Sequence, residues 1–556
     1  MNLKQEIQNL IKGEVFDDLE TLKLYSRDAS LFEVFPKLVV WPKNSDDVSK
    51  IVKFVADKKL EDPKKFSKLS VTARAAGSCM SGGSLSESIV LDFTKHMNKF
   101  SVEPNSQTAE VELGVFYRDF EPETLKHGLI LPCYTASKNL CALGGMIGNN
   151  CAGEKTLAYG KMENYIEELE VILSDGSKKI FKSLSRPEAL RKSHEHTHEG
   201  AIYERMMRLV DENRETIIEA KPKVSKNSAG YYLWNIERQG LFDLTKILVG
   251  SQGTLGIITR AKIRLVKTKP KSKLLVVFMK DLNGLGDLVN TILQYGPESV
   301  ESYDDSTMKL ALRFFPELFK LMKARLLRIM WSFLPEAFMA LTGGIPKLVL
   351  MAEFAGDNEL EIQTKLEKLK AEVTKAGFKS RITKNANDAE KYWTIRRESF
   401  NLLRKHIRGK RTAPFIDDIC VEPKYLPEFL PRLRKILDEA KFVYTIAGHA
   451  GNGNFHIIPL MDMREHKNRA LIPYLSEKVY LLVKEYGGSI TAEHNDGLVR
   501  TPYLAMMFST QILTLFAETK KIFDPLTIFN PGKKVPVPQK EGPGSVEYMV
   551  GHLVRE

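Results

Sequence analysis

The chain is 556 residues long, with 43% hydrophobic and 27% charged residues, so it can bury large cores but exceeds what one core usually holds. The formal net charge of +12 favours anionic partners such as carboxylates, acidic lipids or nucleic acid without choosing among them. Five cysteines, an odd number with no C-x-x-C pair, argue against a disulfide framework and an intrinsic iron–sulfur cluster.

The first 22 residues mix charges into an apolar periodicity and lack the uninterrupted apolar core of a secretory signal. No run in the chain approaches the ~18 apolar residues of a membrane-spanning helix. We therefore expect a cytoplasmic protein, with peripheral contact at the inner face of the membrane as an open alternative.

Short β-rich runs alternate with helical stretches as far as residue 266, which predicts an α+β fold. One helix is expected at 48–58, where apolar and polar residues alternate with helical spacing. Strands are expected at 37–42, 68–77, 88–93, 168–177 and 257–266. The Asp175-Gly176 pair predicts a hairpin turn.

A basic linker at 267–273 leads into a second run of strand, helix, strand and helix, at 274–280, 284–295, 347–356 and 358–376. This order predicts a second α+β layer. Further helices follow from Glu422, and the chain ends in a tail that contains proline and glycine.

Two segments look like insertions. His194, His196 and His198 stand at alternate positions and could gather a metal ion, although their polar surroundings favour a solvated loop. The segment 317–345 places apolar residues from Phe319 to Phe333 on one helical face, with basic residues elsewhere. Core packing is the preferred interpretation of that face, and contact with a membrane is the alternative.

Three segments rich in glycine and small residues, at 74–84, 132–153 and 248–259, follow or precede strand-like runs. Glycine lets backbone N–H groups approach an anion closely, so such loops can cradle a pyrophosphate. Neither the dinucleotide fingerprint nor the Walker pattern is present.

In order and spacing, these segments resemble the FAD-binding domain of the vanillyl-alcohol oxidase and p-cresol methylhydroxylase superfamily. Within it, the chain resembles the D-lactate, glycolate and D-2-hydroxyglutarate dehydrogenase branch, from about Tyr25 to Lys533. The resemblance implies a two-subdomain FAD-binding domain at 1–267 and an α+β substrate (cap) domain at 268–490, with the insertion near 317–345. A helical segment at 491–556 would complete the active site and return to the FAD domain.

The resemblance also implies which residues bind FAD. They are Arg74, Ala76, Gly77, Ser78, Cys79, Ser81, Gly82, Gly83, Pro132, Ser137, Leu143, Gly144, Gly145, Asn149, Asn150, Ala152, Gly153, Gly253, Ile257 and Asn530. Ser78 stands where members with covalent flavin often have histidine, so we expect noncovalent FAD. Gln252 replaces the family's usual Glu, and Ala76 a common Gly.

His449 and His456 lie seven residues apart, with three glycines between or beside them, so we expect a loop to aim them. Glu493 and His494 add a carboxylate and a third imidazole. Two imidazoles and one carboxylate suit a divalent ion such as Zn²⁺ or Mn²⁺ with positions left for substrate. The resemblance implies His449, His456 and Glu493 as ligands.

By the same resemblance, Asn454 is a substrate contact and His494 the catalytic group that faces the reacting hydroxyl. Arg396 lies in a segment like the family's W-x-x-R, where arginine holds the substrate carboxylate, a task that suits its planar bidentate geometry. An exposed basic helix is the alternative. Ile416 falls where relatives that select a second carboxylate tend to have Lys, which argues against a dicarboxylate.

The resemblance implies FAD-dependent oxidation of a small D-2-hydroxy acid, with electrons passed to quinone or to a separate iron–sulfur or flavoprotein acceptor. A noncatalytic FAD-binding subunit of an electron-transfer complex is the alternative, although a scaffold needs no metal or carboxylate site. Nucleic-acid binding would rest on net charge alone, because no recognition motif is present, so no nucleic-acid partner is expected.

Overall fold

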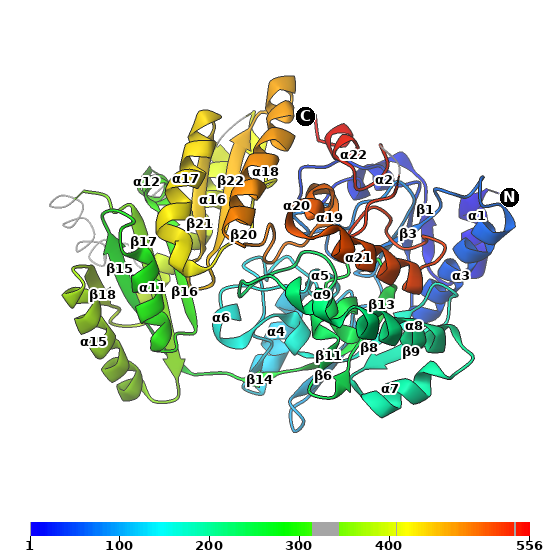
Figure 1. Cartoon of the computed structure of the whole chain (residues 1–556), viewed down its shortest axis with the longest axis horizontal. Helices are drawn as coiled ribbons and strands as arrows, with labels where there is room; N and C mark the ends of the chain where they lie inside the picture. The colour runs from blue at the N-terminus through cyan, green and yellow to red at the C-terminus, as the bar shows by residue number, and fades with distance from the viewer. Residues whose placement is uncertain (1, 314–343, 407–408, 539–540, 556) are drawn as a thin grey trace.

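The structure, a computed structural model, describes residues 2–313, 344–406, 409–538 and 541–555. Figure 1 shows two lobes joined by an extended connection between β14 (Val266–Lys267) and β15 (Lys271–Met279). Of the predicted insertion, residues 317–343 lie outside the described residues, so both interpretations of its helical face remain predictions. In the described part of the chain, no helix combines the length and apolar character needed to cross a membrane.

The first lobe contains a four-stranded sheet near the N-terminus. Its strands in spatial order are β1 (Glu14–Phe16), β2 (Leu38–Trp41), β4 (Ile89–Asp92) and β3 (Val71–Arg74). Helix α3 (Ser45–Glu61) packs beside it and buries Val48, Ile51, Val52 and Val55, whose spacing places them on one helical face. These elements confirm the predicted strands and helix of this region.

A five-stranded antiparallel sheet forms the rest of this lobe. Its order is β5 (Phe100–Glu103), β6 (Thr108–Glu112), β13 (Ile257–Arg264), β8 (Ile166–Ile172) and β9 (Lys178–Lys182). Alternate residues of β13 are buried, as its sequence pattern predicts. Strands β8 and β9 form the predicted hairpin, and Gly176 at its turn has a φ of +82°.

Helices and short ladders surround these two sheets. The helices that precede β14 are α1 (Leu3–Leu10), α2 (Leu19–Tyr25), α4 (Tyr117–Lys126), α5 (Leu143–Asn149), α6 (Thr156–Tyr159), α7 (Arg186–Ser193), α8 (His198–Glu212), α9 (Arg214–Glu219) and α10 (Thr245–Leu248). The short ladders join β7 (Leu129–Ile130) to β14, and β10 (Leu184–Ser185) to β12 (Leu241–Phe242) and β11 (Glu237–Arg238). The mixed architecture confirms the α+β prediction.

The second lobe is built on an eight-stranded sheet. Its order is β18 (Lys379–Ile382), β15, β17 (Leu348–Gly356), β16 (Ser299–Asp304), β21 (Val443–His449), β22 (Asn454–Met461) and β19 (Arg411–Thr412), and β20 (Ile419–Cys420) also pairs with β22. The accompanying helices are α11 (Leu285–Gln294), α12 (Asp305–Arg313), α15 (Glu359–Lys375), α16 (Ala386–His406), α17 (Leu426–Glu439) and α18 (His466–Glu485).

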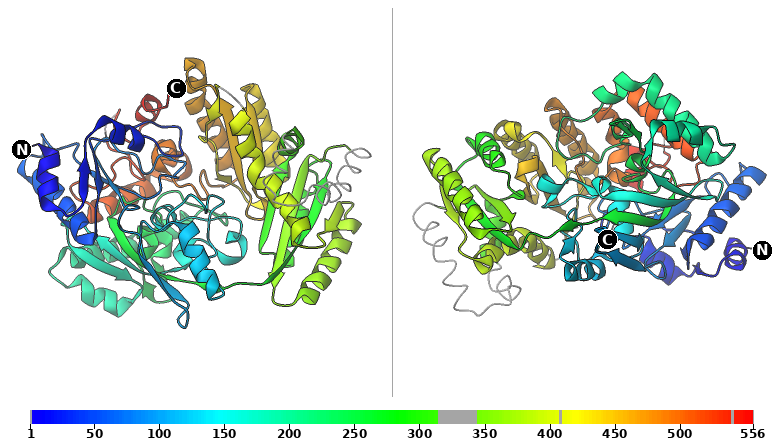
Figure 2. Two further views of the ribbon diagram at one scale, coloured as in Figure 1. Left: turned by 180° about the vertical axis from the view of Figure 1, so that it is seen from behind. Right: turned by 90° about the horizontal axis from the view of Figure 1, so that it is seen from below.

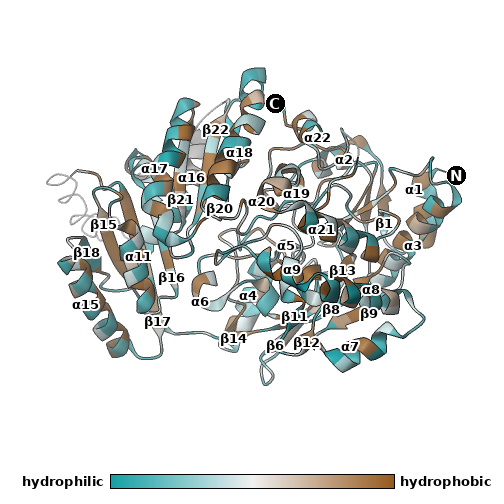
Figure 3. Cartoon of the chain, viewed as in Figure 1, coloured by the Kyte–Doolittle hydropathy of each residue, from teal (hydrophilic) through white to brown (hydrophobic). Residues whose placement is uncertain are grey.

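The sequence of strand β15 is a continuous apolar run because both faces of the strand are buried. Leu275 and Val277 join the same core cluster as the buried face of α15, whereas Leu274 and Val276 join a cluster with Tyr392 of α16. Both faces of the strand are therefore covered, and no polar alternation is needed. Figure 3 shows the apolar strands of this sheet beside helices such as α15 that are largely hydrophilic.

The chain returns to the first lobe at its C-terminus, as both views in Figure 2 show. The helices of this segment are α19 (Gly497–Arg500), α20 (Leu504–Met507), α21 (Thr510–Phe523) and α22 (Val546–Gly551). Phe529 forms a β-bridge with Val71, and Leu553 forms one with Phe32. The loop between α18 and α19 therefore connects the second lobe to the first.

Candidate active site

A cavity of about 310 Å³ lies where the two lobes meet, and all three glycine-rich segments contribute to it. The predicted FAD contacts that line it are Arg74, Ala76, Gly77, Ser78, Cys79, Gly83, Ser137, Gly144, Gly145, Asn149 and Gly253. The opposite wall is formed by Arg396, Asp417, His449, His456, Glu493 and His494. The two groups of predicted residues, far apart in the sequence, therefore share one cavity.

The other predicted FAD contacts lie behind this lining. They are Ser81, Gly82, Pro132, Leu143, Asn150, Ala152, Gly153, Ile257 and Asn530. Asn530 donates from Nδ2 to the backbone oxygens of Gly83 and Gln252, both at 2.8 Å. The Ser81 hydroxyl donates to the backbone oxygen of His494 at 2.9 Å. These side chains hold the cavity loops in place rather than facing the cavity.

Helix α5 presents bare backbone to the cavity. A Cβ added at Gly145 would meet no atom within 4 Å, and the same is true at Gly148. A Cβ at Gly144 would instead lie 2.5 Å from the backbone oxygen of Leu113, so glycine is required there for close packing. The open face leaves room for a flat or phosphorylated group to approach the helix backbone.

His449 and His456 are brought together by a β-hairpin, which corrects the expectation that a loop aims them. His449 ends β21 and pairs with Asn454, while His456 in β22 pairs with Ala447. Residues 447 and 449 are two apart in one strand, so the paired geometry places both imidazoles on the same face of the sheet. Gly453 closes the turn with a φ of +67°.

Glu493 completes a group that could hold a metal ion, because one ligand atom from each of the three residues lies within 4.8 Å of the others. Glu493 Oε1 is 3.2 Å from His449 Nε2, and Oε2 is 4.0 Å from His456 Nε2. The other ring nitrogens are held by carboxylates: His449 Nδ1 lies 2.6 Å from Glu301 and His456 Nδ1 lies 3.0 Å from Asp417. This leaves both Nε2 atoms for an ion, the arrangement typical of metal-binding histidines.

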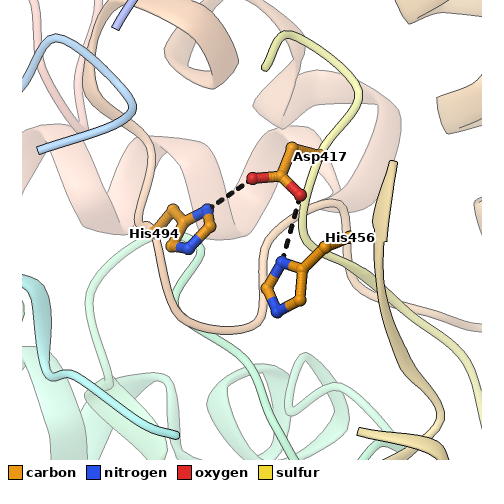
Figure 4. A group of neighbouring side chains, drawn as sticks. All are labelled: Asp417, His456 and His494. Carbon is orange, nitrogen blue, oxygen red and sulfur yellow. Dashed lines mark hydrogen bonds and ion pairs between the residues drawn. The ribbon is translucent and has the colours of Figure 1, made fainter. Parts of the chain in front are cut away.

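Figure 4 shows Asp417 between His456 and His494. Asp417 is fully buried, and its Oδ2 lies 2.9 Å from His494 Nδ1. Burial opposes ionisation of Asp417, but His494 and His456 hold its pKa well below the usual range. Burial lowers the pKa of His494, yet Asp418 and Asp417 outweigh burial and raise it to about 9. The pair therefore fixes the imidazole and favours its protonated form.

Asp418 organises the loop that carries Glu493 and His494. Its Oδ2 accepts hydrogen bonds from the backbone N–H groups of Ala492, Glu493 and His494 at 2.9, 2.8 and 2.7 Å. Asn454 donates from Nδ2 to Asp418 Oδ1 at 3.1 Å, is fully buried and lies outside the cavity lining. The structure thus places Asn454 behind the loop that carries Glu493 and His494, and its contact with substrate stays a prediction.

Glu301 contacts both Arg396 and His449, one of the three residues that could hold a metal ion. Arg396 Nε lies 2.5 Å from Glu301 Oε2, while Arg396 Nη2 is buried without a hydrogen-bond partner. Glu301 thereby joins Arg396 to His449. Burial raises the pKa of Glu301, but Arg396 and His449 outweigh it and lower the pKa to about 2. Arg396 also lines the cavity, so its guanidinium group lies close to an anion bound there.

Two families match the chain: "FAD linked oxidases, C-terminal domain" over residues 268–534 and "FAD binding domain" over residues 36–180. The chain thus combines an FAD-binding domain with the C-terminal domain of FAD-linked oxidases. Its fold is that of the p-cresol methylhydroxylase type. The solved p-cresol methylhydroxylase has a TM-score of 0.67 at 15% identity, over 96% of this chain and 97% of that one. The 4-ethylphenol oxidase of Gulosibacter chungangensis has 0.68 at 16%, over 97% of each chain.

The curated relatives that match are named as 2-hydroxy-acid dehydrogenases or as a glycolate oxidase subunit. The chain is 26% identical to the D-2-hydroxyglutarate dehydrogenase of Pseudomonas putida, over 94% of this chain and 50% of that protein. It is 26% identical to the D-lactate dehydrogenase of Archaeoglobus fulgidus, over 90% and 91%, and 25% identical to glycolate oxidase subunit GlcD of Bacillus subtilis, over 96% of each. The chain spans about half the length of the D-2-hydroxyglutarate dehydrogenases that it matches.

Gln252 is accommodated in the FAD-binding part of the chain because both ends of its amide form hydrogen bonds. Nε2 donates to Asn149 Oδ1 at 3.0 Å, and Oε1 accepts from the backbone N–H of Gly497 at 2.8 Å. A glutamate carboxylate could not donate to Asn149. The glutamine therefore joins two of the glycine-rich segments to the start of α19, and both ends of its amide have a hydrogen-bond partner.

Acid or heat denaturation is expected to release the flavin into the supernatant. Ser78 lines the cavity where a tethering histidine would stand, and a hydroxyl there offers no nucleophile comparable to imidazole. The measurement is the visible absorbance of the precipitated chain and of the supernatant. Yellow colour kept by the washed precipitate would contradict noncovalent binding.

Replacing Glu301 with Gln should weaken metal binding by about 10- to 100-fold, the usual cost of losing a carboxylate that orients a ligand histidine. It should also raise the KM for the acid substrate, because Arg396 loses its anchor. Calorimetric metal titration and steady-state kinetics measure the two effects. A matched control is Glu298→Gln, because Glu298 is buried in the same lobe but pairs with Lys155 and Lys269. Equal losses in both variants would contradict the specific role of Glu301.

Two other sequence predictions concern residues away from this wall. His198 Nε2 lies 3.0 Å from the Ser174 hydroxyl at the start of α8, and the metal-compatible groups within the described residues do not include His194, His196 or His198. Ile416 is fully buried and does not line the cavity. Its position therefore offers no direct contact to a bound acid.

Proposed function

We propose that this chain is an FAD-dependent dehydrogenase that oxidises a small D-2-hydroxy acid such as D-lactate, or the achiral glycolate, to the 2-oxo acid. One observation carries the proposal: the glycine-rich segments, Arg396 and the group of His449, His456 and Glu493 all line a single cavity. The relatives named as D-lactate and D-2-hydroxyglutarate dehydrogenases support the same reaction class.

The cavity favours an acid with one carboxylate. Among the described residues that line it, the arginines are Arg74 and Arg396, and no lysine is present. Arg74 already donates to the backbone oxygens of Tyr25 and Arg27, so it is committed to its own loop. Arg396 is left to bind the substrate carboxylate, and no further arginine or lysine among the described lining residues is left for a second carboxylate.

The chain's own residues divide the work. Bound FAD would accept the hydride from the carbinol carbon, and a divalent ion such as Zn²⁺ or Mn²⁺ held by His449, His456 and Glu493 would make the substrate hydroxyl more acidic. Arg396 orients the carboxylate. Neutral His494 would take the hydroxyl proton at Nε2, because Asp417 occupies Nδ1 and stabilises the imidazolium that forms. A divalent ion held beside it would oppose the protonation that Asp418 and Asp417 favour in its absence.

Reduced flavin needs an acceptor. The five cysteines are all free thiols and no C-x-x-C pair occurs in the sequence, so a separate acceptor is proposed: quinone, or a partner iron–sulfur or flavoprotein subunit. The relative named as a glycolate oxidase subunit supports a partner protein. Peripheral membrane contact would serve the quinone alternative.

The deciding experiment is anaerobic mixing of the FAD-bound, metal-loaded protein with D- and L-lactate, glycolate, D-2-hydroxyglutarate and longer 2-hydroxy acids. Bleaching of the flavin by a small D-2-hydroxy acid, and not by its L enantiomer, is expected. Preference for D-2-hydroxyglutarate would contradict the proposed monocarboxylate, and failure of every acid to bleach bound flavin would contradict the reaction.

A further inference from the structure

We propose that Lys226 is a positioning residue for the metal site: its buried ammonium group holds one oxygen of Glu493 and so limits this carboxylate to a single bond with the ion. The inference rests on the proposed metal site and goes beyond it, because it concerns how tightly the ion is held. Lys226 comes from the first lobe, in the segment between α9 and Tyr232, and is not part of the predicted ligand set.

The contacts of Lys226 are few and specific. Its side chain is fully buried, and Nζ lies 2.5 Å from Glu493 Oε1 and 3.3 Å from the backbone oxygen of Gly153. Oε1 also lies 3.2 Å from His449 Nε2, whereas the ion-pair contact of Glu493 Oε2 among the described residues is with His456 Nε2, 4.0 Å away. Oε1 is therefore taken by the ammonium group, and Oε2 is the oxygen left for an ion.

A fixed positive charge beside a ligand carboxylate has two consequences. It repels a divalent cation, so the ion is bound more weakly than by Glu493 alone. It also prevents the carboxylate from chelating through both oxygens, which keeps a coordination position open for the substrate. Before the ion binds, the same charge neutralises a buried carboxylate that would otherwise be costly to bury.

The position of Glu493 does not depend on Lys226 alone. The backbone N–H of Glu493 donates to Asp418 Oδ2 at 2.8 Å, and the N–H of His494 donates to the same atom at 2.7 Å. The loop is thus fixed through its backbone. Replacing Lys226 should free the carboxylate and leave the loop in place.

Lys161 provides a matched control. It is also buried and reaches the same loop, but its Nζ contacts neutral groups: the backbone oxygens of Asn227 and Ala492, the hydroxyl of Ser228 and the hydroxyl of Tyr232. Lys161 holds backbone, whereas Lys226 holds a charged ligand. Comparing variants of the two lysines therefore distinguishes a general loss of loop structure from a specific effect on binding of the ion.

The test is calorimetric titration of metal-free, FAD-bound protein with Zn²⁺ or Mn²⁺. Lys226→Met and the more conservative Lys226→Gln should bind the ion at least ~10-fold more tightly than the unmodified protein, since a like charge is removed. Lys226→Arg should stay close to the unmodified protein, and Lys161→Met should change affinity by less than ~3-fold because its charge lies off the carboxylate.

A crystal structure of the Mn²⁺-loaded protein provides a readout that does not require any variant to fold. Coordination by one Glu493 oxygen, with Lys226 on the other, is expected. If both oxygens bind the ion, or if folded Lys226→Gln binds it no more tightly than the unmodified protein, the role of Lys226 is wrong while the metal site stands. If the unmodified protein binds no divalent ion, both the metal site and this inference are wrong.

Discussion

Replacing His494 with alanine is expected to slow reduction of the flavin by substrate about 100- to 10,000-fold, the usual loss for a positioned acid–base group. His494 lines the cavity, and Asp417 holds its Nδ1 so that Nε2 is left for the substrate hydroxyl. Arg396 and the proposed metal ligands remain in this variant, so substrate binding should change much less. Anaerobic stopped-flow measurement of flavin bleaching at several substrate concentrations separates the two quantities.

Asp417→Asn is the informative companion variant. An amide can still approach His494 Nδ1 but cannot stabilise the imidazolium by charge, so a smaller loss of the reduction rate is expected. If His494→Ala reduces its flavin as fast as the unmodified protein, the hydroxyl proton leaves by another route, and the role assigned to His494 is wrong.

The parts of the fold that the sequence predicts well are those with local patterns. The β8–β9 hairpin follows from Asp175-Gly176, and the half-buried strand β13 follows from strict alternation. The glycine-rich segments also predict where a ligand can bind, because a ligand approaches the backbone closely only where side chains are absent or small. The proposed metal ligands could be selected only through the family resemblance, since two histidines seven residues apart are a weak signal by themselves.

The residues that sequence reasoning missed are those whose role depends on distant partners. Glu301 lies in the fully buried strand β16, where its carboxylate is explained only by Arg396 and His449. Asp417 and Asp418 form an acidic pair after an apolar run, a signal that could have suggested buried carboxylates. It could not have shown that one orients imidazoles and the other collects backbone N–H groups.

Lys226 gives the clearest case of a tertiary effect. In the sequence it stands among other lysines near residues 221–226, which is typical of an exposed basic loop. In the structure it is fully buried against Glu493, 267 residues away. The charge pattern alone cannot distinguish an exposed lysine from a buried one, because burial of a lysine depends on a carboxylate that only the fold supplies.

Replacing His456 with alanine is expected to remove the bound ion and to lower turnover by roughly a thousand-fold or more, since a Lewis acid contributes several kcal/mol of charge stabilisation. FAD should stay bound, because the residues predicted to hold it lie in the first lobe. Metal content, the ratio of flavin to protein and turnover are measured on the same sample. His96→Ala is the control, since His96 pairs with Glu14 away from the cavity and should lose none of the three. Full turnover by a demonstrably metal-free His456→Ala protein would show that oxidation of the substrate needs no metal ion. Arg396 would then be left to orient the acid and His494 to take its hydroxyl proton.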